Sequence, residues 1–513
     1  MSGFRKHVLP AVLASFGLAA QASAEIRSVE GPVPTSAESS IYGAAYVEGA
    51  SLSIVLSHYG YVEEEYFVRG KAAAYRHTSK GTVRQTEEHP YVTRIVVRRP
   101  ADASRFSGVV HFEPIHPTQG FTSHWLTLNR YLMSRGDIYV VAGTGSADKG
   151  WSGSPHQPDE TAPVGSGKIE KWFDPQRYAE LQWPEEEGIR FEVMADIGRK
   201  LRSKDADNPL KALDVRAILV GGWSHGGSFQ RTFINEGFHD RARLPDGHPV
   251  FSGYLIGVSG RRSPPGYLPL YNDEPFVQLD NPRRDLKPID VPVIEFLTEL
   301  EAGREPEKKQ APDRDGPIGA HRLYELGGVI HTESLVDPSK SYPDRPNIMQ
   351  LIQRNYPKRQ LPGYEIYGCP LLQSDVPHGD IVRATVENLR RWVLDGVVPP
   401  HAPRLKWADG KPAKDEAGNQ LGGIRPAEFQ VPLAFYGPYP GTDLPGCFPR
   451  TGYAIHVRNP LSHAELIRRY QTPERYLELY DAATDRLVQE RWLLPEDALR
   501  LKAKAREYAL QQF

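Results

Sequence analysis

Cysteine is scarce in this chain of 513 residues, which contains only Cys369 and Cys447. Two cysteines so far apart exclude a cysteine-rich zinc module. A dominant charge is also missing, because 62 Lys and Arg residues stand against 64 Asp and Glu residues, for a formal net charge of -2. Such a chain has no overall field that would attract DNA or RNA, and we expect no nucleic-acid partner. No stretch reaches 18 apolar residues, so we expect no membrane span in the mature chain.

The first 24 residues have the pattern of a cleavable signal peptide. A positive start, Arg5-Lys6-His7, precedes an apolar run at 8–20, and Ala22-Ser23-Ala24 supplies the small residues that signal peptidase reads. An uncleaved N-terminal anchor is the alternative. We expect cleavage after Ala24 and a periplasmic or secreted protein. That compartment permits a disulfide between the two cysteines, Cys369 and Cys447, although the sequence leaves open whether they are bridged.

The rest of the chain, 25–513, is predicted to form one enlarged α/β domain. Residues 25–105 are β-rich, 106–400 alternate between strands and helices, and 401–513 end in helices that we expect to pack on the core. Apolar strands that alternate with amphipathic helices favour a mainly parallel sheet with helices on both faces. Strands are predicted at 61–68, 91–97, 109–112, 137–142, 215–220, 254–258, 291–297 and 322–326, and helices at 190–201 and 382–394.

One short segment, Gly222-Trp223-Ser224-His225-Gly226, indicates a nucleophilic serine. The pattern G-x-S-x-G is weak alone, but here a strand leads into it and a helix leads out. A serine at such a bend takes strained backbone angles, and side chains at the flanking positions would clash. This clash explains why glycine occupies positions 222 and 226, as Gly222 and Gly226. An ordinary glycine-rich turn is the competing interpretation. We predict that Ser224 is the nucleophile.

A serine needs a base and an acid that orients the base, in the chain order serine, acid, histidine. The strand at 291–297 is followed by Glu299 and Glu301. We prefer Glu301, since it lies further past the strand where the loop can turn toward the site, and keep Glu299 as the alternative acid. His331 follows the next strand and a glycine turn, where the base belongs, and His378 is the alternative base.

An oxyanion hole requires two backbone N–H donors. One donor is predicted to be His225, which directly follows the nucleophile. The second should come from the connection at 113–120, where His116, Thr118 or Gln119 could also direct a side chain inward. The sequence does not choose among them.

A metal hydrolase is a second enzyme class that we considered. Its ligands would be His111, Glu113 and His116, but on an extended strand His116 faces away from His111. No H-E-x-x-H helix is present. We therefore predict neither a metal nor another cofactor.

The sequence resembles the α/β-hydrolase superfamily, and more narrowly a group of exported bacterial α/β-hydrolase-domain proteins. Segments that carry the likeness span nearly the whole mature chain: GYVEEEYFVRGKA (60–72), RIVVRRP (94–100), RFSGVVHFE (105–113), GGWSHGGSFQRTFINE, PVIEFLTELE, LYELGGVIH, RRWVLDGVVPP and NQLGGIRP (419–426). The resemblance implies Ser224 as nucleophile, His331 as base and a carboxylate between Thr298 and Glu301. This sequence departs from the usual pattern of the superfamily at the acid position, where it has glutamate and aspartate is commoner.

The leading hypothesis is thus a serine esterase that cleaves small carboxylic esters. An amidase or transacylase with the same triad, and an exported binding protein without chemistry, are the alternatives. Long proline-rich connections at 146–184 and 332–377 are expected to lie over the site as a lid. Their aromatic residues are candidates to line a pocket, although the sequence singles out none of them: Trp151, Trp172, Tyr342, Tyr356 and Tyr364. The sequence leaves the ester and the oligomeric state open.

Overall fold

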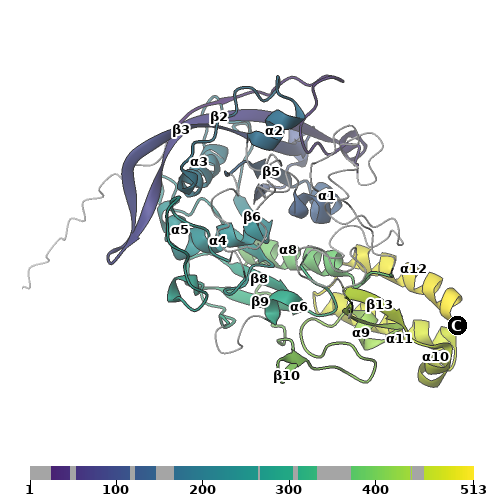
Figure 1. The fold of residues 1–513 in the computed structure, drawn as a ribbon. Helices are drawn as coiled ribbons and strands as arrows, with labels where there is room; N and C mark the ends of the chain where they lie inside the picture. Colours follow the sequence, from purple (N-terminus) through teal and green to yellow (C-terminus); the bar gives the residue numbers. More distant parts are fainter. Residues whose placement is uncertain are drawn as a thin grey trace, which may run out of the picture.

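The computed structural model describes residues 25–46, 53–115, 122–145, 167–263, 266–303, 310–331, 371–439, 441 and 456–513. At its centre is a nine-stranded sheet with the order β1-β2-β3-β5-β4-β6-β7-β8-β9 (Figure 1). The last six strands of this sheet in chain order run parallel to one another. They are β4 (Val109–Pro114), β5 (Ile138–Ala142), β6 (Ala217–Trp223), β7 (Gly253–Gly257), β8 (Val293–Thr298) and β9 (His321–Leu326). The mainly parallel central sheet expected from the sequence is confirmed.

The β-rich N-terminal segment extends this same sheet. Strands β1 (Glu25–Glu30), β2 (Tyr61–Thr78) and β3 (Gly81–Pro100) pair antiparallel, and β3 pairs antiparallel with β5. Both hairpin strands are longer than the sequence predicted, and Pro100 ends β3 as expected. In Figure 1 the hairpin curves beside α3 (Arg190–Arg202), with which β2 is in contact.

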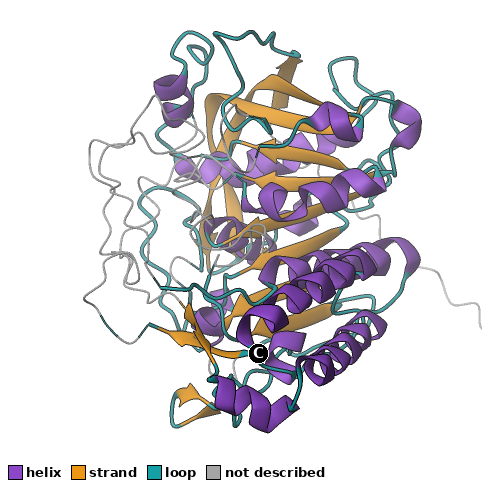
Figure 2. Cartoon of the chain, turned by 90° about the vertical axis from the view of Figure 1, so that its right-hand side faces the viewer, coloured by secondary structure: helices purple, strands orange, loops and turns teal. Residues whose placement is uncertain are grey.

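Helices cover both faces of the sheet, as predicted (Figure 2). Side chains alternate along each strand, so Val110 and Phe112 join a core with α3 and α4 (His225–Asn235), whereas Val109 joins the core on the other face. On that second face lie α1 (Ser123–Arg135) and α8 (His378–Asp395). Burying each large apolar side chain between these layers contributes about 1.5–3 kcal/mol.

The C-terminal segment packs against the α1 and α8 face. Arg383 of α8 forms an ion pair with Asp497 at 2.7 Å, and Asn388 of α8 donates to the carbonyl of Arg491 at 2.8 Å. Apolar residues of its helices share one buried cluster with the central sheet. The segment contains α9 (Ala427–Gln430), β12 (Ala434–Pro438), β13 (His456–Pro460), α10 (His463–Tyr470), α11 (Pro473–Gln489) and α12 (Pro495–Gln512).

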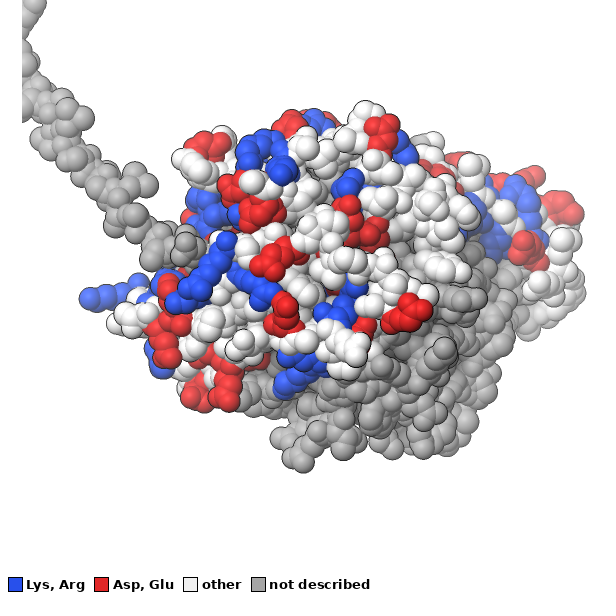
Figure 3. Space-filling view, turned by 90° about the horizontal axis from the view of Figure 1, so that it is seen from above, with Lys and Arg blue, Asp and Glu red and all other residues white. Residues whose placement is uncertain are grey.

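Shorter elements occupy the connections. These are α2 (Lys168–Phe173), α5 (Phe238–Arg241), α6 (Glu299–Ala302), β10 (Trp407–Ala408) and β11 (Lys411–Pro412). On the face seen in Figure 3, acidic and basic side chains are intermixed rather than gathered by sign. Among the described helices, none is both long enough and apolar enough to cross a bilayer.

Candidate active site

Ser224 lies at the bend between β6 and α4, where the sequence predicts the nucleophile. Its backbone has φ 54° and ψ -114°, a conformation that costs a non-glycine residue about 1–3 kcal/mol. Two hydrogen bonds hold the bend: the N–H of Ser224 donates to the carbonyl of Gly257 at 2.9 Å, and the carbonyl of Ser224 accepts from the N–H of Ser228 at 2.8 Å. The serine is thereby attached to the end of β7.

The steric need for glycine at this bend agrees with the sequence argument at Gly222 but not at Gly226. A Cβ at Gly222 would lie 3.0 Å from the side-chain amide of Gln230 and 3.2 Å from the backbone carbonyl carbon of Gly226, which is tight. A Cβ at Gly226 would meet only ordinary contact, 3.6 Å from the carbonyl oxygen of Pro114. The tight position is Gly227, where a Cβ would lie 2.6 Å from the carbonyl oxygen of Gly257. Close packing of α4 on the end of β7 therefore requires glycine at a further position, Gly227, that the sequence did not predict.

His331 follows β9 and is bonded to Glu301, the preferred acid. Nδ1 of His331 lies 2.9 Å from Oε1 of Glu301, whose side chain is 2% exposed, whereas that of His331 is 35% exposed. An ionised carboxylate only accepts hydrogen bonds, so Nδ1 carries the proton and Nε2 is left as a proton acceptor. This tautomer is the one that a general base requires.

Thr298, at the end of β8, connects these two residues, a role that was not predicted from the sequence. Its hydroxyl donates to Oε2 of Glu301 and accepts from the N–H of His331, the latter at 2.8 Å. The acid therefore lies in a one-turn helix, α6, that Thr298 caps, rather than in the predicted loop. The sequence does contain the signal, since Thr-x-x-Glu is the pattern of a capping box.

The alternative acid, Glu299, points elsewhere. It accepts a hydrogen bond from the N–H of Gly328 at 2.9 Å and pairs with His456 of β13 at 3.2 Å. Burial raises the pKa of Glu299, but the hydrogen bond and charge of His456 outweigh it and hold that pKa below its usual value. Glu299 thus joins α6 to the C-terminal segment.

The alternative base, His378, is the first residue of α8 and is buried. Its ring stacks on Phe296 at 5.4 Å between centroids and lies 6.4 Å from the ring of Trp223. These contacts place His378 between the sheet and α8.

Ser224 and His331 are attached to neighbouring strands at the same edge of the sheet. Ser224 is bonded to the end of β7 through Gly257, and His331 to the end of β8 through Thr298. Adjacent strands lie about 4.8 Å apart, so the two residues are attached at neighbouring positions along this edge. Both residues adopt a positive φ, 54° and 48°, so each is held by its surroundings in an otherwise disfavoured backbone.

The predicted oxyanion donors are only partly within the described residues. His225 is the first residue of α4 and directly follows Ser224, the position that the sequence predicts for one donor. In the connection after β4, the N–H of Ile115 donates to the carbonyl of Ala142 at 2.9 Å and is therefore engaged. The other candidates, His116, Thr118 and Gln119, lie outside the described residues.

Other predicted features fall outside the described residues too. These are the signal peptide, Cys369 and Cys447, most of both predicted lid segments, and Trp151, Tyr342, Tyr356 and Tyr364, together with the side chain of Trp172.

The histidines and carboxylates near β4 do not form a metal site among the described residues. His111 is bonded to Asp137 at 3.0 Å between Nε2 and Oδ2, and Glu113 accepts a hydrogen bond from Tyr139 at 2.7 Å. Both are buried within the protein core, and each of the two is held by a partner of its own.

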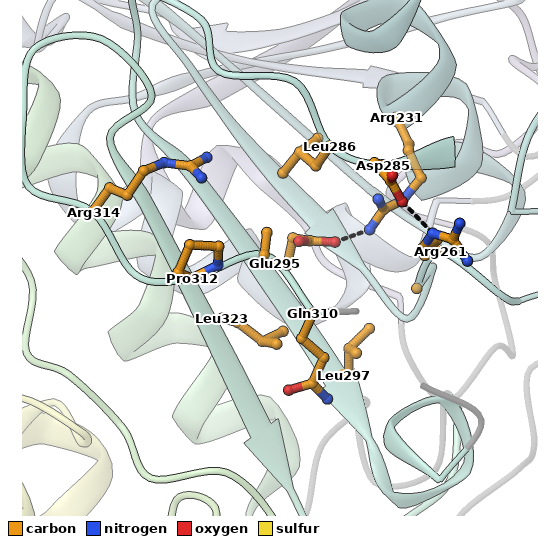
Figure 4. A pocket seen from close by; sticks show the side chains of 12 residues that line it. Arg231, Arg261, Asp285, Leu286, Glu295, Leu297, Gln310, Pro312, Arg314 and Leu323 are labelled. Atoms are coloured by element: carbon orange, nitrogen blue, oxygen red, sulfur yellow. Dashed lines mark hydrogen bonds and ion pairs between the residues drawn. The ribbon is translucent and has the colours of Figure 1, made fainter. Parts of the chain in front are cut away.

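A cavity of about 210 Å³ opens beside α4, further along the helix than Ser224 (Figure 4). Neither Ser224 nor His331 nor Glu301 is among the residues that line it. Among the residues that line the cavity, Arg231 of α4 forms an ion pair with Glu295 of β8. This ion pair links α4 to the central sheet.

Comparisons with known proteins bear on the family. The model of a family described as alpha/beta hydrolase domain matches residues 29–503. No curated protein matches the chain in sequence.

Solved structures of esterases are similar at 12–14% identity. An esterase of Pyrobaculum calidifontis is 14% identical, with 52% of this chain and 78% of that one covered and a TM-score of 0.26. One from Pseudomonas putida is 13% identical over 59% and 83%, with a TM-score of 0.27. One from Rhizomucor miehei is 12% identical over 57% and 83%, with a TM-score of 0.30. Because the family model spans nearly the whole described chain, the protein belongs to the α/β-hydrolase domain family.

Proposed function

We propose that this α/β hydrolase is a serine esterase that cleaves carboxylic esters through an acyl-enzyme. The observation that carries the proposal is the buried Glu301 bonded to Nδ1 of His331, at the same sheet edge as a serine in a strained bend. A buried acid that fixes the tautomer of a half-exposed histidine is what a hydroxyl nucleophile needs to become reactive.

The proposed reaction has two halves. His331 accepts the proton of Ser224 at Nε2 while the serine oxygen attacks the ester carbonyl, and Glu301 stabilises the resulting imidazolium. The tetrahedral oxyanion is bound by the N–H of His225 at the start of α4, where the helix dipole favours negative charge. The imidazolium then protonates the departing alcohol, and a water activated by His331 releases the acid.

A fluorophosphonate probe tests the nucleophile directly. The wild-type protein should be labelled at Ser224 and should hydrolyse p-nitrophenyl esters, and Ser224→Ala should abolish both. Ser134→Ala is the control, because Ser134 lies near the end of α1, where its hydroxyl is bonded to the carbonyl of Tyr131, and its loss should leave labelling intact. Labelling that survives Ser224→Ala would refute the assignment.

Two further measurements separate the alternatives. An ester and an anilide with the same acyl group distinguish an esterase from an amidase, and added alcohol or amine acceptors reveal a transacylase. A protein that is neither labelled nor active on a broad ester panel would instead support a binding function on this fold.

We also propose that the protein is exported and functions in the periplasm or outside the cell. The proposal rests on the leader pattern at 1–24. Cell fractionation and N-terminal sequencing should find a protein that begins at Glu25, and a cytoplasmic protein that keeps residues 1–24 would contradict export.

A further inference from the structure

Glu113 is a buried carboxyl group that the proposed reaction does not use. It lies near the end of β4 and is 3% exposed. Its Oε2 accepts a hydrogen bond from the hydroxyl of Tyr139 on β5 at 2.7 Å, and its Oε1 accepts one from the N–H of His124 in the first turn of α1 at 3.2 Å. One side chain thus joins three elements.

The residue after Glu113 lies beside the nucleophile bend. A Cβ built on Gly226, two residues beyond the nucleophile, would lie 3.6 Å from the carbonyl oxygen of Pro114. The N–H of Ile115 is bonded to the carbonyl of Ala142 at the end of β5. Glu113 therefore belongs to the short segment that runs between the end of β5 and the bend.

We propose, on the basis of the serine-hydrolase function above, that Glu113 is a positioning residue, which holds the end of β4 in place against the nucleophile bend. It acts through Pro114 and the start of α1 and does not itself touch the substrate. A carboxyl group that accepts hydrogen bonds from both β5 and α1 fixes the positions of these two elements relative to β4. A displacement of about 1 Å in the alignment of reacting groups can lower the rate about 10²-fold.

The charge of this group matters because the second oxyanion donor is expected from the connection that begins at Glu113. Burial raises the pKa of Glu113 to about 8, against the opposing hydrogen bonds from Tyr139 and α1 and the charge of Arg98 on β3. The ring of His124 on α1 is neutral, because burial and the charge of His111 hold its pKa well below the usual value. His111, on β4 itself, is bonded to a carboxylate. Glu113 is thus mostly protonated at pH 7, and its ionisation at higher pH places a negative charge where it opposes the oxyanion.

Two substitutions distinguish the positioning role of Glu113 from the effect of its charge. Glu113→Ala removes the joint, and we expect kcat to fall about 10- to 100-fold with KM changed less than about 3-fold. Glu113→Gln keeps an acceptor for α1 and a polar partner for Tyr139, so kcat at pH 7 should stay within about 3-fold of wild type. The wild-type rate should decline as pH rises through about 8, and Glu113→Gln should not show that decline.

Glu192 provides a matched control on α3. This buried glutamate also accepts from a tyrosine hydroxyl, that of Tyr75 at 2.7 Å, and from a backbone N–H, that of Ala73 at 2.8 Å. Glu192→Ala should lower the urea midpoint while the folded protein keeps its kcat and its pH profile. Comparing the two variants shows whether the loss of kcat is specific to Glu113 or follows from the loss of any buried glutamate that bonds neighbouring elements.

The outcomes are distinguishable. A wild-type protein that the fluorophosphonate does not label overturns the proposed function, and this inference with it. A labelled wild type overturns the inference alone if Glu113→Ala keeps the wild-type kcat, or if Glu113→Gln retains the decline above pH 8. If Glu113→Ala does not fold, the pH profile of Glu113→Gln decides.

Discussion

Replacing each of two neighbouring glutamates by glutamine tests which of them orients the base. Glu301 lies 2.9 Å from Nδ1 of His331, whereas Glu299 pairs with His456. Glu301→Gln keeps the size of the side chain but removes its charge. Its amide can also donate to Nδ1, which would move the proton to Nε2 and block that atom as a base.

The magnitude follows from the geometry. An ionised carboxylate and an imidazolium with charge centres about 4 Å apart interact by about 4 kcal/mol at the effective dielectric constant of about 20 that suits protein sites. This attraction exists only once the imidazolium has formed, so it lowers the barrier rather than the ground state. Its loss corresponds to a fall of about 10³-fold in kcat/KM, and the wrong tautomer would add to it.

The assay is kcat/KM for a p-nitrophenyl ester at pH 7, with urea unfolding of each variant as a check on folding. We expect Glu301→Gln to lose about 10³-fold with little change in the urea midpoint. Glu299→Gln should lose less than about 10-fold in rate but unfold at lower urea, because its ion pair with His456 and its bond to Gly328 are weakened. A large loss in Glu299→Gln together with a small one in Glu301→Gln would refute the assignment of the acid.

Three other substitutions test the packing and the buried charges. Gly227→Ala would place a Cβ 2.6 Å from the carbonyl oxygen of Gly257, so we expect about 1–3 kcal/mol of destabilisation and weaker probe labelling of Ser224. Phe251→Ala removes a fully buried ring that packs against other aromatic rings, and urea unfolding should show a loss of about 3–5 kcal/mol. Burial raises the pKa of Asp196 to about 8, so the folded protein binds a proton there that the unfolded chain releases near pH 4, and this contribution to stability is lost as pH rises toward 8. Asp196→Asn should therefore gain stability relative to wild type between pH 5 and 8, and a constant difference over that range would contradict the shift.

The strands and the nucleophile bend were predictable because their signals are local. An apolar run that ends in a glycine turn and continues as an amphipathic helix has one low-energy arrangement, and β6, Ser224 and α4 follow it. The steric argument at the bend was local as well, and it held for Gly222 but missed Gly227. It compared glycines with their own chain neighbours, whereas the tight contact at Gly227 comes from the end of β7.

The sequence by itself determined the order of the elements, the place of Ser224 on a strand-to-helix bend, and a short set of candidate partners after later strands. Only the tertiary structure shows that Glu301 is bonded to His331 and Glu299 is not, because in a one-turn helix two residues at this spacing point to different sides. Which side meets His331 depends on the turn after β9, and which side meets His456 depends on a strand more than 150 positions further along the chain. Hydrophobic periodicity records burial along a segment but carries no information on which distant segment it meets.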